Sequence, residues 1–218
     1  MKKIDVKTWK RRVPYENFIG YTNPIFSLAT RLDVTDLYNR CKREKTSLFA
    51  DFLFLAVKCL NSVEELRIRI SGDEVVMYDT IDPSFIVMTD EGVIVTCRSK
   101  MCDSYAEFYK GVRTDIERAK AAAAKEVWNF DGDVRTDLFF ISCMPWVELT
   151  AVSNPYNLSD RENSSVPRLT WSKIVDENGR KIMTMDIAAH HALVDGEPVC
   201  RAFIKIQEAL NDVENFFK

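Results

Sequence analysis

Four stretches of the chain place hydrophobic residues at the spacing of an α-helix. Residues 33–45 repeat them on one face, which predicts an amphipathic helix beginning near Asp33. Residues 48–60 are apolar on nearly all sides, which is typical of a helix buried in a core. Residues 104–127, with their alanine run, predict a long helix, and a last helix follows Gly196. The inner face of that last helix is marked by Val199, Phe203, Ile206 and Leu210.

Shorter apolar or alternating segments predict β-strands, most of them joined in pairs by turns. The paired segments are 66–70 with 74–78, 84–89 with 93–97, and 169–175 with 182–189. Each pair flanks a turn that contains glycine: Gly72, Gly92 or Gly179. Residues 138–143 form a further compact strand that ends near Pro145. Helices and hairpins together predict a mixed α/β domain.

Composition agrees with one folded unit. The chain has 218 residues, 46% hydrophobic and 29% charged, which is enough to bury a sizeable core within one large domain. We therefore expect a single domain over residues 1–218. The 30 basic and 33 acidic residues leave a formal net charge of −3. That balance disfavours nucleic acid and anionic membrane surfaces as partners.

Neither export nor membrane insertion is indicated. Trp9 and a basic cluster follow the first residues where a secretory signal would have an apolar stretch. The longest apolar stretch, residues 52–57, is far shorter than the roughly 20 residues of a spanning helix. The six cysteines show no Cys-x-x-Cys spacing, so we expect reduced thiols. These features predict a cytoplasmic protein.

The two histidines of the chain, His190 and His191, are adjacent at the end of a predicted strand. Successive side chains on a strand point to opposite faces, so we expect one imidazole to face inward and the other to face a cleft. The same geometry disfavours a shared metal ion, because two ligands must face the same way and no third histidine exists. The structural alternative is that both are ordinary polar groups, with Asp195 capping the next helix.

Ser142 is a second candidate, at the end of an apolar strand just before Pro145 and Trp146. Its hydroxyl could donate a hydrogen bond to a developing oxyanion. A Ser-His-Asp hydrolase would use the same residue types. The sequence around Ser142 lacks the glycines of a nucleophile elbow, which disfavours hydrolysis.

The histidine segment also carries a resemblance to a known family. His190-His191-x-x-x-Asp195-Gly196 is similar to the motif of type A chloramphenicol acetyltransferases, which the catalytic domains of dihydrolipoyl acyltransferases share. The chain length favours the smaller chloramphenicol enzymes. The resemblance implies a two-layer α/β sandwich with a mixed β-sheet and helices packed on it. Further similar positions are Trp9, Arg11-Arg12, Phe26-Ser27-Leu28, Glu65-Leu66-Arg67, Asp82-Pro83-x-Phe85, Ser142-x-x-Pro145-Trp146 and Thr170.

The resemblance implies a separate role for each of these residues. His191 would act as general base on an acceptor hydroxyl that attacks the thioester of acetyl-CoA, a task that suits neutral imidazole. Ser142 would stabilise the tetrahedral oxyanion. Thr170 would assist through a bound water. Asp195 would form an ion pair with Arg11, which is an architectural role.

Binding residues follow from the same resemblance. Trp146 and Lys173 correspond to positions near the coenzyme, with acetyl-CoA as cosubstrate and no metal. Phe18 occupies the position of an antibiotic-contacting tyrosine, so one hydroxyl contact is lost. Phe26 keeps the acceptor pocket aromatic. Chloramphenicol is therefore the leading acceptor.

The resemblance further implies a homotrimer, with active sites between subunits and His191 of one chain facing a pocket of the next. The expected reaction is direct O-acetylation in a ternary complex, which inactivates the antibiotic. Two alternatives stay open: an acyltransferase for a different hydroxyl or thiol acceptor, and a ligand-binding relative without turnover.

Overall fold

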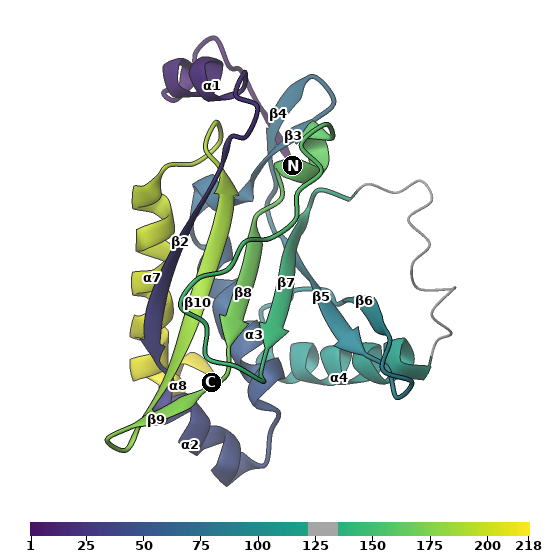
Figure 1. Cartoon of the computed structure of the whole chain (residues 1–218), viewed down its shortest axis with the longest axis vertical. Coiled ribbons are helices and arrows are strands. Elements are labelled where there is room, and N and C mark those ends of the chain that lie inside the picture. The colour runs from purple at the N-terminus through teal and green to yellow at the C-terminus, as the bar shows by residue number, and fades with distance from the viewer. Residues whose placement is uncertain (122–134) are drawn as a thin grey trace.

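A mixed seven-stranded β-sheet organises the part of the chain that the computed structural model describes, residues 1–121 and 135–218. Neighbouring strands are antiparallel except for two parallel pairs, β5 with β7 and β7 with β8. The mixed sheet predicted from the sequence is therefore present (Figure 1). Its strand order is β2 (Ile25–Asp33), β10 (Arg180–His190), β8 (Arg168–Ser172), β7 (Leu138–Met144), β5 (Asp82–Met88) and β6 (Ile94–Arg98), with the short β9 (Val175–Glu177) paired to β10.

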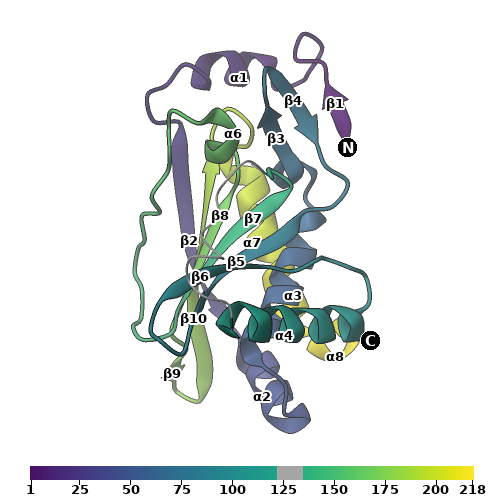
Figure 2. The same ribbon diagram turned by 90° about the vertical axis from the view of Figure 1, so that its right-hand side faces the viewer.

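The two faces of this sheet have different surroundings. Figure 2 shows the main helices on one face, while the segment between β7 and the short helix α6 (Arg161–Ser164) runs along the other face. Strand β10 reflects the difference, because Met185 and Ile187 belong to the helix-side core while Asp186 points to the other face. The expected two-layer arrangement is thus confirmed, with one face left to polar side chains.

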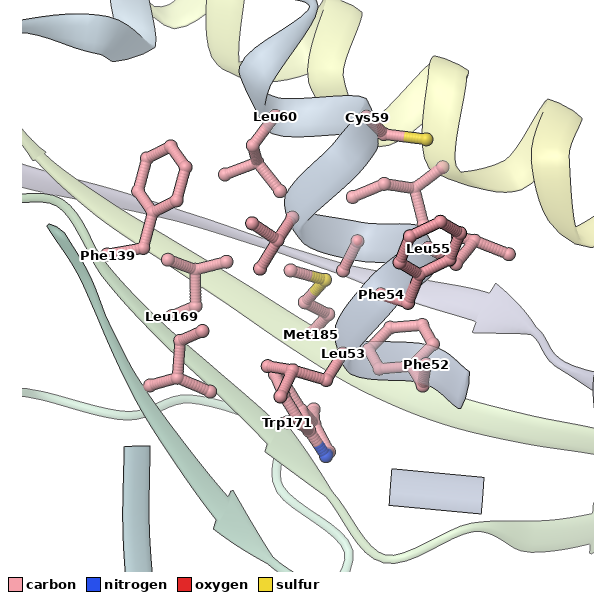
Figure 3. Packing of buried hydrophobic residues seen from close by; sticks show 14 of the residues in the cluster. Phe52, Leu53, Phe54, Leu55, Cys59, Leu60, Phe139, Leu169, Trp171 and Met185 are labelled. Carbon is pink, nitrogen blue, oxygen red and sulfur yellow. The ribbon is translucent and has the colours of Figure 1, made fainter. Parts of the chain in front are cut away.

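The buried helix predicted over residues 48–60 is α3 (Leu48–Asn61), and its side chains are in the core on nearly all sides. The Ser47 side chain caps the helix by accepting a hydrogen bond from the amide of Ala50. Phe52 meets the Trp171 ring edge-on at 5.0 Å between ring centroids. Figure 3 shows α3 side chains packed against Trp171, Leu169 and Met185 of the sheet. Helix α3 is therefore the centre of the core.

The other predicted elements are present with small shifts at their ends. Helix α2 is Thr35–Glu44 and α7 is Gly196–Asn211, followed by a short α8 (Val213–Phe216). The hairpin predicted near Gly72 is β3 (Ile68–Ser71) with β4 (Glu74–Met77). Of the long helix predicted over residues 104–127, Tyr105–Ala121 is α4, and residues 122–127 lie outside the described residues.

Several elements were not predicted. Strand β2 pairs with β10 along nine residues, and β1 (Lys2–Ile4) joins β4 in a small second sheet. Helix α1 (Arg12–Phe18) and the short helix η1 (Glu64–Arg67) were also missed. All six cysteines are free thiols, as expected. Within the described residues, no helix is long and apolar enough to cross a membrane.

Candidate active site

His190 and His191 have different surroundings, as the alternation of a strand predicts. His190 ends β10, is 3% exposed, and its Nδ1 accepts a hydrogen bond from the Ala192 amide at 3.2 Å. Burial lowers the pKa of His190 to about 4, so its imidazole is neutral near pH 7. His190 therefore has the environment of a structural residue.

The His191 imidazole is held between two aromatic rings. It stacks on Phe18 of α1 with ring centroids 4.0 Å apart and planes at 10°, and it contacts Phe26 of β2 at 4.7 Å. Its backbone amide donates to the carbonyl of Pro24 at 2.8 Å. With 32% of the side chain exposed, the imidazole is both fixed in orientation and open to a small molecule.

Arg11 ties the histidine segment to the N-terminal part of the chain. Its guanidinium donates to both oxygens of the Asp195 carboxylate and to the backbone carbonyls of His191 and Ala192. This contact holds the pKa of Asp195 below its ordinary value. Asp195 Oδ1 also lies 3.3 Å from His191 Nδ1. The Asp195 side chain makes no capping bond to α7; its hydrogen bonds come from the Arg11 guanidinium, and His191 Nδ1 makes no hydrogen bond within the described residues.

Replacing Asp195 by asparagine is expected to lower the free energy of unfolding at neutral pH by about 1 kcal/mol, a modest value because Asp195 is half exposed. A carboxylate whose folded pKa is depressed stabilises the fold above its unfolded pKa of about 3.9, and the contribution is lost as pH falls through the folded pKa. Wild type and variant should therefore differ at neutral pH, and the difference should disappear only as the pH falls below about 3.9 and through the lower folded pKa. Urea unfolding of wild type and Asp195→Asn, at neutral pH and in acid, measures this difference in the free energy of unfolding.

The control for that experiment is the exposed pair between Arg12 and Glu16 on α1, in which both side chains are half in solvent. Glu16→Gln is expected to change the stability by close to zero at either pH. If Asp195→Asn were equally destabilised at both pH values, the effect would come from packing and not from charge.

Ser142 belongs to a row of polar side chains on the face away from the helices. It pairs in register with Thr170 of β8, which in turn pairs with Asp186 of β10. Side chains directly opposite one another on neighbouring strands share a face and lie about 5 Å apart. Thr170 is 1% exposed and donates to the Asn154 side chain at 3.3 Å. Ser142 and Thr170 are therefore neighbours on the polar face.

Ser142 and His191 are not neighbours within one chain. His191 lies five residues beyond Asp186, the β10 residue in the row of Ser142. That separation is roughly 17 Å along the strand and roughly 10 Å across two strand spacings. Figure 1 shows the arrowheads of β10 and β7 at opposite ends of the sheet. A single chain cannot bring both side chains to the same reacting atoms.

The residues predicted to bind the acceptor are likewise divided between the His191 side and the Ser142 side of the chain. Phe18 and Phe26 lie against His191, whereas Thr170 lies beside Ser142. Phe26 is also one of the residues that line a cavity of about 260 Å³ at the edge of the polar face, together with Ser27 and Asn154. The volume of this cavity is slightly below the roughly 300–1,000 Å³ that is typical of small-molecule sites.

The predicted coenzyme residues lie at the carboxyl ends of β7 and β8. The Lys173 amide donates to the Val147 carbonyl at 3.0 Å, which brings the segment after Pro145 alongside β8. Lys173 and Pro145 line an apolar cavity of about 280 Å³. Trp146 is 64% exposed nearby, so it is a surface side chain and not a core residue.

Three residues of the polar face were missed by sequence reasoning: Asn154, Tyr156 and Asp186. Asn154 and Tyr156 belong to the segment along that face, and the Tyr156 hydroxyl donates to the Ala188 carbonyl at 3.4 Å. The signal available in the sequence was Asp186 itself, a carboxylate between the apolar residues Met185 and Ile187 inside a predicted strand.

The Cys143 thiol, next to Ser142, is a poor nucleophile near neutral pH. Burial raises the pKa of the Cys143 thiol to about 11, so the thiolate nucleophile is scarce near pH 7. Within residues 1–121 and 135–218, no group of three or more His, Cys, Asp or Glu side chains is arranged to hold a metal ion.

Comparisons with known proteins give one consistent result. Residues 1–207 match the family model described as chloramphenicol acetyltransferase. The chain is 28% identical over 212 residues to chloramphenicol acetyltransferase 3 of Escherichia coli, covering 96% of each chain, and 24% identical to chloramphenicol acetyltransferase of Campylobacter coli, covering 96% and 98%.

Solved structures agree with the family model. A chloramphenicol acetyltransferase structure superposes with a TM-score of 0.85 at 26% identity, covering 96% of this chain and all of the other. A dihydrolipoamide acetyltransferase from Azotobacter vinelandii, 16% identical with a TM-score of 0.68, shares the fold over 94% of this chain and 88% of its own. The chain therefore belongs to the chloramphenicol acetyltransferase family of acyltransferases.

Proposed function

We propose that this protein transfers the acetyl group of acetyl-CoA to a hydroxyl of chloramphenicol, and so inactivates the antibiotic. The observation that carries the proposal is the His191 imidazole, which is partly exposed, fixed between Phe18 and Phe26, and backed by the Arg11–Asp195 ion pair. A general base must be held in one orientation and yet reach its substrate. Family membership supports the choice of acceptor and cosubstrate.

The proposed reaction is a direct transfer within a ternary complex. His191 accepts the proton of the acceptor hydroxyl as its oxygen attacks the thioester carbonyl. Because Nδ1 faces Asp195, Nε2 is the nitrogen that receives the proton. A carbon–oxygen bond forms, the carbon–sulfur bond breaks, and the proton passes to the departing thiolate, which leaves as coenzyme A.

Ser142 donates a hydrogen bond to the oxyanion of the tetrahedral intermediate, a contribution realised mainly in the transition state. Thr170, its neighbour on β8, assists through a bound water. No acyl-enzyme forms in this scheme, which agrees with the high pKa of the Cys143 thiol beside Ser142.

We propose that the active site is completed between subunits of a homotrimer. The separation of His191 from Ser142 along and across the sheet supports this assembly, since one chain supplies only half of the site. In a cyclic trimer each chain would present His191 to the Ser142 side of the next chain. All sites in such a ring are equivalent.

Acetyl-CoA would bind beside the carboxyl ends of β7 and β8. The apolar cavity lined by Pro145 and Lys173 suits an apolar part of the coenzyme, and the Lys173 ammonium suits a phosphate. The exposed Trp146 ring offers a surface for stacking. We place the activity in the cytoplasm, where acetyl-CoA is available.

The test is the rate of thiol release from acetyl-CoA, followed with a thiol-reactive dye, with and without chloramphenicol. We expect release that depends on the antibiotic, with the O-acetyl ester identified by mass spectrometry. Release only with another hydroxyl or thiol compound would remove chloramphenicol as the acceptor. Binding of chloramphenicol without any thiol release would contradict the enzymatic function.

A further inference from the structure

Asp186 is a buried carboxylate in the middle of the polar face. It is 4% exposed and lies on β10, opposite Ala29 of β2 on one side and Thr170 of β8 on the other. Aspartate is rarely buried to this extent without a cationic or hydrogen-bonding partner. Asp186 therefore needs an explanation that packing alone does not provide.

The partners of Asp186 do not satisfy its carboxylate. Burial raises the pKa of Asp186 to about 6, against the opposing effect of a side-chain hydrogen bond with Ser27. Within the described part of the chain, Oδ1 is buried and has no hydrogen-bond partner. The group is still mainly ionised near pH 7, so the sheet carries a buried negative charge that can accept further hydrogen bonds.

A complementary donor lies close by. Asn154 accepts the hydroxyl of Thr170 through Oδ1, while its Nδ2 is buried and has no partner among the described residues. Asn154 lines the cavity of about 260 Å³, together with Ser27 and Ala188, which flank Asp186 on the same face of the sheet. Ser27 is exposed, so the cavity opens to solvent. The unsatisfied donor of Asn154 thus lies in the lining of this open cavity, and the unsatisfied acceptor of Asp186 lies next to two of the lining residues, Ser27 and Ala188.

We infer that Asp186 and Asn154 form a specificity subsite for the acceptor. This subsite binds a second polar group of the acceptor, separate from the hydroxyl that is acetylated, and that group is a hydrogen-bond donor such as a hydroxyl, an amide or an amine. The inference rests on the proposed function, because it names the class of acceptor for the same site. Buried polar groups are almost always paired in native proteins, and a bound acceptor would supply the missing partners.

The spacing of the row suits this arrangement. Asp186 lies two strands from Ser142, or roughly 10 Å. A small alcohol whose reacting hydroxyl is near Ser142 and Thr170 can therefore extend to Asp186 with its other end. The carboxylate then favours acceptors that carry a donor there, and it disfavours acceptors that leave it desolvated and unpaired.

The experiment compares three alcohols that share a nitrophenyl propanol skeleton. They are chloramphenicol, the free amine left when its dichloroacetyl group is removed, and para-nitrophenyl propanol, which has a terminal hydroxyl and no second donor. We expect Asp186→Ala to raise KM for the first two about tenfold and to leave KM for the third within about twofold. Asp186→Asn keeps an acceptor oxygen but removes the charge, so it should weaken the amine more than chloramphenicol.

Thr184→Val is the matched control, because Thr184 is buried on the same face of β10 two residues away. It should leave all three KM values unchanged. The inference would be overturned if the Asp186 variants changed KM equally for all three alcohols, or changed it for none. A purely structural role of Asp186 cannot distinguish alcohols that carry the second donor from the one that lacks it.

Calorimetric binding of the same alcohols without acetyl-CoA separates this inference from the proposed function. One outcome is that wild type acetylates none of the alcohols and still binds the donor-bearing ones more tightly, with that preference abolished by Asp186→Ala. This outcome would support the subsite and contradict the proposed acetyl transfer. If acetylation occurs and wild type binds all three alcohols equally well, the subsite is contradicted and the proposed reaction is supported.

Discussion

Replacing His191 by alanine is expected to lower kcat for acetyl transfer to chloramphenicol about a thousandfold, because the acceptor hydroxyl then has no base to receive its proton. The variant should keep its fold. The contacts that anchor this segment use backbone groups of His191, its carbonyl to Arg11 and its amide to Pro24, and alanine preserves both. Thiol release from acetyl-CoA measures the rate, and thermal unfolding checks the fold.

The adjacent histidine provides the control. His190→Asn places a side-chain oxygen near the position of Nδ1, where it can still accept the Ala192 amide. Since His190 is buried, this variant should lose stability while kcat falls by no more than a few-fold. If the two variants lost activity equally, or if His190→Asn lost more, the assignment of the base to His191 would be wrong.

Mixing two inactive variants is expected to restore activity. Ser142→Ala should lower kcat about a hundredfold by removing the oxyanion donor. When His191→Ala and Ser142→Ala chains are co-expressed in equal amounts, a site between subunits has its histidine from one chain and its serine from the next. Random assembly then gives about a quarter of the sites both wild-type residues, and so about a quarter of wild-type activity.

The control for mixing is a chain that carries both substitutions. Co-expressed with His191→Ala, it supplies no intact histidine and should restore nothing, although the oligomers form equally well. Activity of each mixture is compared after its oligomeric state has been checked by light scattering. Absence of recovery in the first mixture, with trimers present, would contradict the shared site and require both residues to act within one chain.

Much of the architecture could be predicted because it depends on local patterns. The apolar residues of α3 occupy all sides of the helix, which by itself requires burial. The hairpin of β3 and β4 follows from alternation and from Gly72, whose φ of +57 suits a tight turn. Strand β2 also alternates, with Phe26, Leu28 and Leu32 on one face. This alternation could have predicted the strand, although we did not predict it.

The candidate residues were identified by a motif, and the one contact expected among them, the ion pair of Asp195 with Arg11, came from the family resemblance and not from local pattern. The sequence by itself determined that the two histidines lie at the end of a strand, that they face different ways, and that a carboxylate follows His191 four residues later. These relations need only the period of a strand and the spacing along the chain, which are properties of neighbouring residues.

Only the tertiary structure decided which distant residues meet. Arg11 contacts Asp195 across 184 positions, and Phe18 and Phe26 enclose an imidazole that follows them by more than 160 positions. The register of β7, β8 and β10 places Ser142 far from His191 and beside Thr170, and it buries Asp186 between β2 and β8 on the polar face. The physical reason is that strand order and register depend on the packing of the whole chain, which no local periodicity specifies.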